Sequence, residues 1–258
     1  MKYVYCALLL FALIISSHGS ARTLQEIKAG GSLRVAVPGD IPGFNMSANG
    51  RHTGYEPELI QAVADSLGVA VSYRQAPIDT YFSLLKSDQV DIAVGALDVT
   101  STLTKQAAEQ IEFSAPIACS PVAITSKNSA IRTKMDLIGK RIGVLSGSAD
   151  QEFAKGLTFN KTVIVYPTSQ EIVFAMLSGK ADATFSYSVM EFPLKQLLPK
   201  EKIYFGEGLW TAHIGVMLQK GNTSVLQAVN ESVSKFMQTP AYTMLSKKYF
   251  DRDVRCAK

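Results

Sequence analysis

Predicted strands and helices alternate along most of the chain, and this alternation constrains the fold more than any other feature. Short segments rich in β-branched residues predict strands at 33–37, 69–74, 90–94, 122–125, 141–145, 162–166, 182–187 and 214–218. After a short amphipathic start at 24–29, amphipathic segments predict helices at 56–67, 169–177, 223–237 and 240–249. This order is typical of an α/β protein with largely parallel sheets flanked by helices.

Two extended segments, 113–127 and 209–221, have the pattern of crossings between lobes rather than turns. The residues between them carry their own alternation of strands and helices. We therefore expect a discontinuous lobe one, residues 22–121 and 213–258, and an inserted lobe two, residues 122–212. Two antiparallel crossings would form a hinge, an architecture used for closing around a ligand.

The N-terminus has the composition of a secretory signal. Lys2 precedes an apolar run at 5–15, and small residues follow it, so we expect cleavage after residue 21 and a periplasmic location. A membrane anchor is the alternative, but the run is shorter than the roughly 20 residues that span a bilayer. Cys6 precedes most of the run, which is not the position of a lipid-attachment cysteine.

Composition excludes several classes of function. The 258 residues are 47% hydrophobic, and 26 basic and 22 acidic residues are interspersed, so neither disorder nor a nucleic-acid-binding face is expected. After cleavage two histidines remain, His52 and His213, and neither lies at ligand spacing to a cysteine. No G-x-S-x-G motif occurs, and we expect no metal, no cofactor and no catalysis.

Six short motifs follow one another in a familiar order. The first three are a Gly-Tyr-Glu helix opening at 54–68, a leucine-rich helix leading into Asp-Ile at 83–93, and Phe-Ser-Ala-Pro at 113–116. The other three motifs lie at 137–148, 177–183 and 248–254. Together they resemble the extracytoplasmic solute-binding proteins of polar amino-acid ABC importers, family 3, with the two-lobed type II periplasmic binding protein fold. The resemblance implies a monomer that captures a small molecule between its lobes and delivers it to a membrane permease.

The elements by which this family recognises an amino acid are changed in this sequence. The arginine that pairs with the ligand carboxylate falls on Leu103, or on Ala107 when the alignment is counted from the other side. The aspartate that grips the ligand ammonium falls on Tyr187. A Gly-Thr-Thr turn is replaced by residues 147–150, Gly-Ser-Ala-Asp. We therefore expect a small polar solute other than a standard α-amino acid.

We expect six ligand-binding residues, which are Asp98, Thr100, Ser148, Asp150 and Tyr187 at or beside positions that the resemblance assigns to the ligand, and Phe44, which follows a Pro-Gly turn. Two acidic side chains in the cleft favour a cationic or a neutral hydroxylated solute, with the aromatic side chains as its walls. Each aspartate could instead serve only as a helix cap, and Tyr187 could be a core aromatic. Arg74 or Lys105 could still supply a cation for an anionic solute.

The mature chain keeps two cysteines, Cys119 and Cys256, in a compartment where disulfides persist. Cys119 lies where the chain leaves lobe one, and the C-terminal tail should return to that lobe, so we expect a disulfide between them. A buried thiol at Cys119 with a free thiol at Cys256 is the alternative.

Two other functions share this fold. An enzyme similar to cyclohexadienyl dehydratase needs a carboxylate-binding arginine and a general acid. The position of the general acid falls on Met190, with Glu191 adjacent. An accessory protein that presents its ligand-bound form to a membrane or redox system would share every feature noted above.

Overall fold

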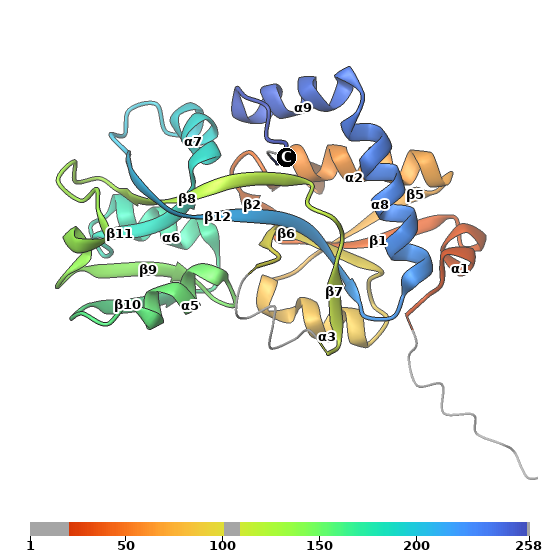
Figure 1. The fold of residues 1–258 in the computed structure, drawn as a ribbon, viewed down its shortest axis with the longest axis horizontal. Helices are drawn as coiled ribbons and strands as arrows, with labels where there is room; N and C mark the ends of the chain where they lie inside the picture. Colours follow the sequence, from red (N-terminus) through yellow and green to blue (C-terminus); the bar gives the residue numbers. More distant parts are fainter. Residues whose placement is uncertain (1–20, 101–108, 257–258) are drawn as a thin grey trace, which may run out of the picture.

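The computed structural model describes residues 21–100 and 109–256. Figure 1 shows two bodies joined by a pair of long strands. We call them lobe one, which contains both ends of the described chain, and lobe two, which lies between the two long strands in sequence. Residues 1–20 of the expected signal peptide, and residues 101–108, lie outside the described residues. No helix of the described residues is long and apolar enough to cross a membrane.

Lobe one is built around a sheet covered by helices. The strands of this sheet in lobe one are β1 (Ser32–Val37), β5 (Ala70–Gln75), β6 (Ile92–Asp98) and the short β7 (Ile111–Phe113). Its helices are α1 (Leu24–Ala29), α2 (Tyr55–Leu67), α3 (Tyr81–Lys86), α8 (Thr223–Met237) and α9 (Pro240–Phe250), and the 3-10 turn η1 (Ile78–Thr80) precedes α3. A small antiparallel sheet contains β2 (Asp40–Ile41), β3 (Asn45–Ala48) and β4 (Arg51–Thr53).

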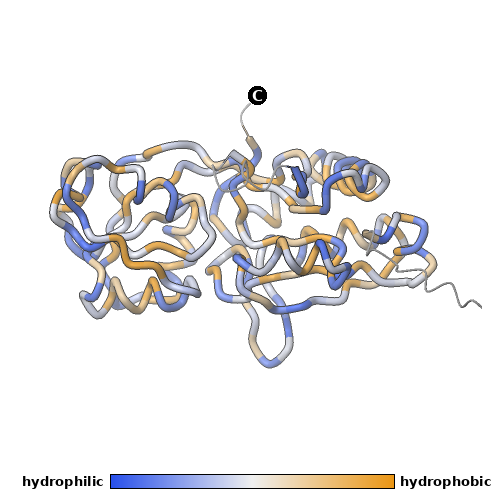
Figure 2. Tube along the Cα trace, turned by 90° about the horizontal axis from the view of Figure 1, so that it is seen from below, coloured by the Kyte–Doolittle hydropathy of each residue, from blue (hydrophilic) through white to orange (hydrophobic). Residues whose placement is uncertain are grey.

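Lobe two repeats this alternation on a smaller scale. Its strands are β9 (Arg141–Leu145), β10 (Thr162–Tyr166) and β11 (Ala183–Tyr187). Its helices are α5 (Ala149–Gly156), α6 (Ser169–Leu177) and α7 (Glu191–Leu197), with 3-10 turns η2 (Lys134–Leu137) and η3 (Ser188–Met190). Figure 2 shows hydrophobic stretches of the chain in both lobes, and each lobe buries an apolar cluster.

The two long strands form the expected hinge. β8 (Ala118–Ser126) and β12 (Tyr204–Gln219) pair antiparallel and run from one lobe into the other. They join the strands of both lobes into one sheet of order β10-β9-β11-β8-β12-β6-β1-β5, with β7 beside β12. The α/β prediction is confirmed. The predicted lobe boundaries at 121/122 and 212/213 fall inside these strands and stay a prediction.

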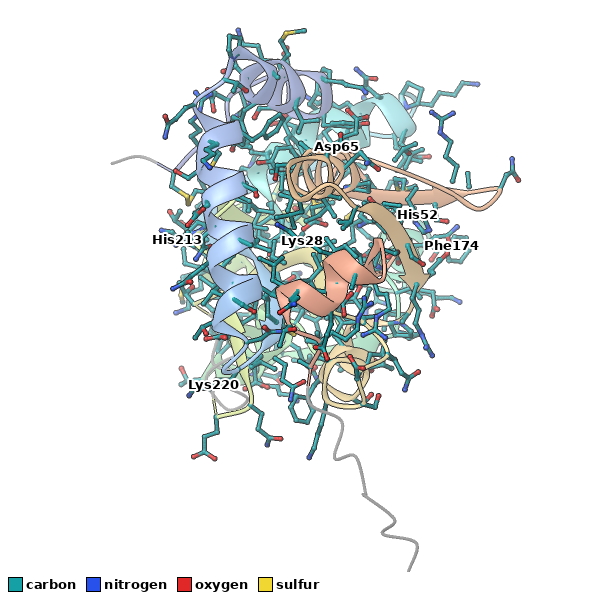
Figure 3. All side chains as sticks on the ribbon, turned by 90° about the vertical axis from the view of Figure 1, so that its right-hand side faces the viewer. Lys28, His52, Asp65, Phe174, His213 and Lys220 are labelled. Atoms are coloured by element: carbon teal, nitrogen blue, oxygen red, sulfur yellow. A yellow bond between two sulfur atoms is a disulfide. The ribbon has the colours of Figure 1, made fainter. Side chains whose placement is uncertain are left out.

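Local sequence explains where several helices begin and end. Thr23 and Glu26 form a reciprocal capping box at the start of α1, which packs beside α8 at the end of lobe one seen in Figure 3. Gly54 enters α2 at φ +132°, where an added Cβ would lie 2.4 Å from the Phe44 carbonyl oxygen. Gly68 ends the same helix in the left-handed conformation.

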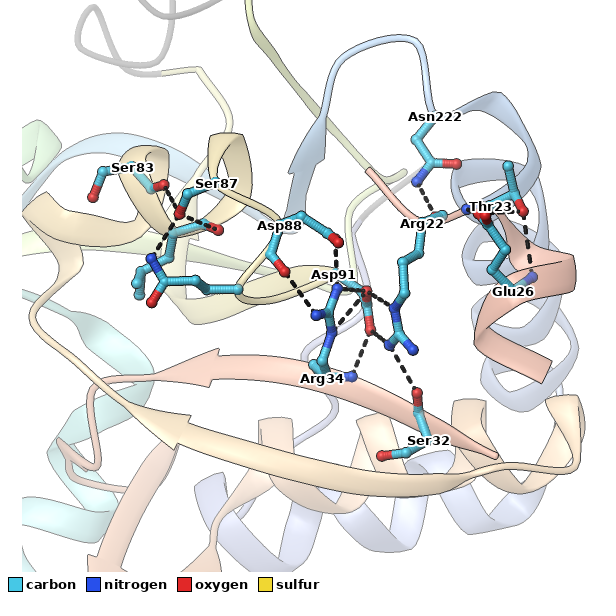
Figure 4. Close-up of polar contacts among 12 residues, drawn as sticks. Arg22, Thr23, Glu26, Ser32, Arg34, Ser83, Ser87, Asp88, Asp91 and Asn222 are labelled. Atoms are coloured by element: carbon cyan, nitrogen blue, oxygen red, sulfur yellow. Dashed lines mark hydrogen bonds and ion pairs between the residues drawn. The ribbon is translucent and has the colours of Figure 1, made fainter. Parts of the chain in front are cut away.

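A buried carboxylate anchors the start of the lobe-one sheet (Figure 4). The side chain of Asp91 is 0% exposed and accepts hydrogen bonds from the guanidinium groups of Arg22 and Arg34, and from the Arg34 backbone N–H at 2.7 Å. Lobe two has the same arrangement near its surface, where Asp182 accepts from the backbone and the guanidinium of Arg141. Each Asp–Arg pair ties the residue just before one strand to the first residues of a neighbouring parallel strand.

The expected disulfide is confirmed. Cys119 on β8 is bonded to Cys256 in the C-terminal tail, with Cα atoms 4.8 Å apart and a sequence separation of 137. The Cys119 N–H also donates to the Val254 carbonyl at 2.8 Å. The tail is thereby held against the hinge.

Candidate functional site

A cavity of about 460 Å³ lies between the two lobes. Lobe one contributes the end of β6 and the region around α3, and lobe two contributes the starts of α5 and α6 and the strand β11. Most of its wall is apolar and includes Ile41, Phe82, Leu145, Ile172, Met176, Phe185, Met190 and Met217. The dimensions suit a small organic molecule with a substantial apolar part.

The lobes touch each other around this cavity. The Tyr187 hydroxyl of lobe two donates to the Ala96 carbonyl of lobe one at 2.6 Å. The Asp40 carboxylate accepts from the Ser169 backbone N–H, at the start of α6, at 2.6 Å. The Ser146 hydroxyl donates to the Asp79 carboxylate at 3.1 Å. The structure therefore represents a closed arrangement.

Asp98 ends β6 and is 5% exposed. One carboxylate oxygen accepts from the backbone N–H and the hydroxyl of Thr100, at 2.9 and 2.7 Å, and from the His213 N–H at 3.3 Å. The other oxygen accepts from the Trp210 indole N–H at 3.0 Å. The side chain thus fixes the hinge strand β12 against β6, and it also lines the cavity.

Asp150 and Ser148 lie at the start of α5, and both line the cavity. The Ser148 hydroxyl caps the helix by accepting from the Gln151 N–H at 3.3 Å, and it donates to the Leu145 carbonyl at 2.8 Å. Asp150 has no hydrogen-bond partner among the described residues. Removal from water, together with the nearby charge of Asp98, raises the pKa of Asp150 to about 7. A ligand in the cavity could therefore supply the hydrogen-bond partner that the Asp150 carboxylate lacks among the described residues.

Tyr187 lines the cavity, but Phe44 does not. Phe44 is 0% exposed and packs edge-on against Tyr187, with ring centroids 5.6 Å apart, and against Tyr55 and Phe250. The expectation that Phe44 forms a wall of the cleft is therefore wrong. Its ring lies in the core of lobe one, where it supports Tyr187 from behind.

Thr100 is exposed and does not line the cavity among the described residues, so its hydroxyl serves Asp98 rather than the cleft. Arg74 is also exposed, lies on the edge strand β5 and donates to the Gln89 side chain at 2.5 Å. It does not supply a cation to the cavity. Lys105, Leu103 and Ala107 lie outside the described residues.

The cavity is acidic. Asp79, Asp98 and Asp150 line it, and none of the described residues in its wall is an arginine, a lysine or a histidine. An anionic group placed there would lose water without gaining a charged partner, whereas a cation would gain one. Within residues 21–100 and 109–256, no group of three or more histidine, cysteine or acidic side chains is arranged to hold a metal ion.

Sequence reasoning missed the residues that hold Asp98. Trp210 is the only tryptophan of the chain, and it lies in the predicted crossing 209–221, so an indole donor near the cleft was a signal available in the sequence. Its ring also packs on Phe153 of α5, with centroids 4.6 Å apart. Trp210 therefore contacts both lobes beside the cavity.

We expect the Asp150→Asn variant to be more stable than the wild type at pH 8. A carboxyl whose pKa is raised on folding holds its proton in the folded protein between about pH 4 and 7, so its contribution to stability falls as the pH rises through that window. The free energy of unfolding should rise by roughly 1 to 2 kcal/mol at pH 8 and be nearly unchanged at pH 4. The expected gain at pH 8 is modest because the side chain keeps some contact with water.

Urea unfolding of both proteins from pH 4 to pH 8 measures this difference. Glu152→Gln, on the same helix, is the matched control and should follow the wild type at every pH. A difference for Asp150→Asn that does not change with pH would contradict the assignment.

The position expected for the general acid of a dehydratase holds no free acid. Met190 lines the cavity with its apolar side chain. Glu191 is not part of the cavity wall among the described residues and forms an ion pair with Lys195 at 2.8 Å, one turn along α7.

Comparisons with known proteins agree with this geometry. The sequence profile of the bacterial extracellular solute-binding proteins, family 3, matches residues 33–252. The L-cystine-binding protein TcyJ of Escherichia coli (strain K12) is 26% identical over 255 residues, covering 97% of this chain and 94% of that protein. The histidine-binding periplasmic protein of Salmonella typhimurium is 26% identical over 232 residues, covering 84% of this chain and 86% of that protein.

Solved structures share the fold. An ancestral arginine-binding protein bound to arginine superposes with a TM-score of 0.78 at 24% identity, covering 85% of this chain and 98% of that one. The ancestral amino acid-binding protein AncCDT-1, a precursor of cyclohexadienyl dehydratase, gives a TM-score of 0.79 at 24% identity, covering 88% and 99%. With two lobes, a hinge of paired strands and a profile match over most of its length, this chain belongs to the bacterial extracellular solute-binding proteins of family 3.

Proposed function

We propose that this protein captures a small solute that carries no carboxylate, either a cation or a neutral hydroxylated molecule, in the cleft between its lobes. The observation that carries the proposal is the acidic wall of the cavity: three aspartates line it, with no basic side chain among its described residues. The relatives named for cystine, histidine and arginine are named for ligands with an α-carboxylate. A carboxylate is a poor match for this wall because each ionised aspartate repels it.

The apolar part of the wall limits the solute further. Met176, Phe185 and Leu145 line the cavity from lobe two, and Phe82 and Met217 line it from lobe one. A ligand with a hydrocarbon body would bury its apolar surface against them, at about 25 cal/mol per Å² removed from water. An organic amine or a hydroxylated compound of modest size therefore fits better than a strongly hydrated ion.

A thermal-shift screen tests this function. We expect carboxylate-free amines or polyols to raise the melting temperature and the standard amino acids, with cystine and ornithine, to leave it unchanged. A ligand at a hundredfold excess over its Kd adds about 2.7 kcal/mol, which corresponds to roughly 5 to 10 °C for a chain of this size. Micromolar binding of any α-amino acid would overturn the proposal.

Delivery to a membrane permease is the second part of the proposal. Family membership supports it, because the lobes of these proteins close on a solute outside the membrane before transfer. We expect the ligand-loaded protein, as a monomer, to stimulate ATP hydrolysis by its cognate importer in proteoliposomes. A ligand-loaded protein that leaves the importer at its basal rate would instead favour an accessory or presenting role.

A further inference from the structure

A buried glutamate lies directly behind the cavity wall. Glu56, in the first turn of α2, is 0% exposed. One of its carboxylate oxygens accepts from the backbone N–H groups of Ala96, at 2.7 Å, and Gly95, at 3.2 Å. The side-chain amide of Asn45, which is also 0% exposed, lies near the carboxylate and favours its ionised form. The second carboxylate oxygen and this amide nevertheless make no hydrogen bond of normal geometry among the described residues. Burying a carboxylate that is only partly hydrogen-bonded costs free energy of folding, which indicates that Glu56 has a specific role.

The residue that Glu56 holds has an unusual backbone. Ala96 adopts φ +53°, the left-handed region that residues with a Cβ occupy at a cost. Its N–H faces Glu56 in the core, and its carbonyl faces the cleft, where it accepts from the Tyr187 hydroxyl of lobe two at 2.6 Å. Gly95, Ala96 and Tyr187 all line the cavity. A continuous chain of hydrogen bonds therefore links the core of lobe one to lobe two.

We propose that Glu56 is a positioning residue for lobe closure. By holding Ala96 in the left-handed conformation, it aims the Ala96 carbonyl at the place that Tyr187 reaches when the lobes close. Loss of this acceptor lets Ala96 relax, and the closed form then loses its bond to Tyr187. The inference adds to the proposed function, since closure retains the solute, but it does not depend on which solute binds.

The role needs an acceptor oxygen rather than a negative charge. The ionisable side chains whose charges interact with Glu56 are tyrosines, namely Tyr55, Tyr73, Tyr81 and Tyr187. None of these can neutralise a carboxylate, and burial raises the pKa of Glu56 to about 7. A protonated Glu56 keeps an oxygen that can accept from Ala96, and Gln has the same oxygen, so Glu56→Gln should preserve the geometry.

The experiment measures closure without any ligand. Spin labels on Lys86→Cys of α3 and Lys155→Cys of α5, both exposed, report the distance between the lobes by double electron–electron resonance. Cys119 and Cys256 are bonded to each other, and the exported protein should lack Cys6, which lies in the expected signal peptide, so the labels are specific. The variants are Glu56→Gln, Glu56→Met and Tyr187→Phe, with the double variant Glu56→Met/Tyr187→Phe.

We expect the ligand-free wild type to populate the short distance. Glu56→Met should lower the closed-to-open ratio about fivefold, Tyr187→Phe should lower it about as much, and the double variant should be no worse than either single one, because both break the same chain. Glu56→Gln should stay within twofold of the wild type. If Glu56→Met does not fold, Ala96→Val, whose branched side chain opposes the left-handed conformation, should give the same loss.

Other outcomes overturn the inference. They are a wild type with no closed population, a Glu56→Met or Ala96→Val variant that melts earlier but closes normally, effects of Glu56→Met and Tyr187→Phe that multiply, or a Glu56→Gln variant that fails like Glu56→Met. Each is distinguishable from failure of the proposed function, which is decided by the ligand screen.

Discussion

Replacing both bridged cysteines, in the variant C119S/C256S, should lower the free energy of unfolding by about 4 to 5 kcal/mol. The bond closes a loop of 137 residues, and cross-linking a loop of this length removes much of the conformational freedom of the unfolded chain. It also fastens the C-terminal tail to β8, one of the two hinge strands.

Guanidinium unfolding of the variant and of the wild type, with and without reductant, measures this loss. The reduced wild type should unfold together with the variant, and reductant should not change the variant itself. A loss below about 1 kcal/mol would show that the bond does not restrict the unfolded chain in this way.

The second large effect is expected for Asp91→Asn, at about 3 kcal/mol of lost stability. Although burial opposes its ionisation, hydrogen bonds from Arg22 and Arg34 lower the pKa of Asp91. Removing one partner from a buried ion pair leaves the other charges without compensation. An asparagine cannot accept all of the hydrogen bonds that the carboxylate receives.

Asp182→Asn is the matched control for this variant. Asp182 makes the equivalent contacts with Arg141 in lobe two, but the side chains are 28% and 45% exposed, so its loss should cost no more than about 1 kcal/mol. The loss for Asp91→Asn should be full above about pH 4 and shrink as the pH falls below that value, because the unfolded wild-type chain then binds a proton that the folded Asp91, whose pKa is lowered, does not yet bind. Urea unfolding from pH 2.5 to pH 7 measures both variants, and equal losses would contradict the role of burial.

The sequence was a good guide to the elements of the fold. The predicted segments at 141–145, 162–166, 169–177 and 223–237 coincide with β9, β10, α6 and α8. Apolar periodicity and capping residues act within one segment, so a single sequence carries that information.

The hinge strands were harder to predict in length. β12 was expected only over 214–218, but it extends from Tyr204 to Gln219. Its first half contains glycines and register shifts, at Gly208 among others, and it is held by pairing with β8 rather than by its own propensity. Pairing between segments far apart in sequence decides such a strand.

The candidate site could be predicted in part. Asp98, Ser148, Asp150 and Tyr187 were nominated from motif positions, and the structure brings all four to one cavity, although ligand binding by them stays a prediction. Phe44 was misplaced because an aromatic after a Pro-Gly turn can face a cleft or a core, and only the packing of Tyr55 and Phe250 decides between them.

Glu56 shows more clearly what cannot be predicted from the sequence. Its motif marks a helix start, and nothing in the local sequence indicates that its carboxylate reaches the backbone at Ala96, 40 residues later. The left-handed conformation of Ala96 is equally invisible, because an alanine carries no signal for it. Both features depend on tertiary contacts.

The most direct test of the acidic, cation-free cleft is isothermal titration with matched pairs of amino acids and their decarboxylated amines, such as L-arginine with agmatine and L-tyrosine with tyramine. The two members of a pair differ only in the carboxylate, so size and side chain are held constant. We predict that an amine binds at least tenfold more tightly than its parent amino acid, and that Asp150→Asn removes most of this preference. Binding of the amino acid as tight as that of its amine, or tighter, in any pair that binds would contradict the account.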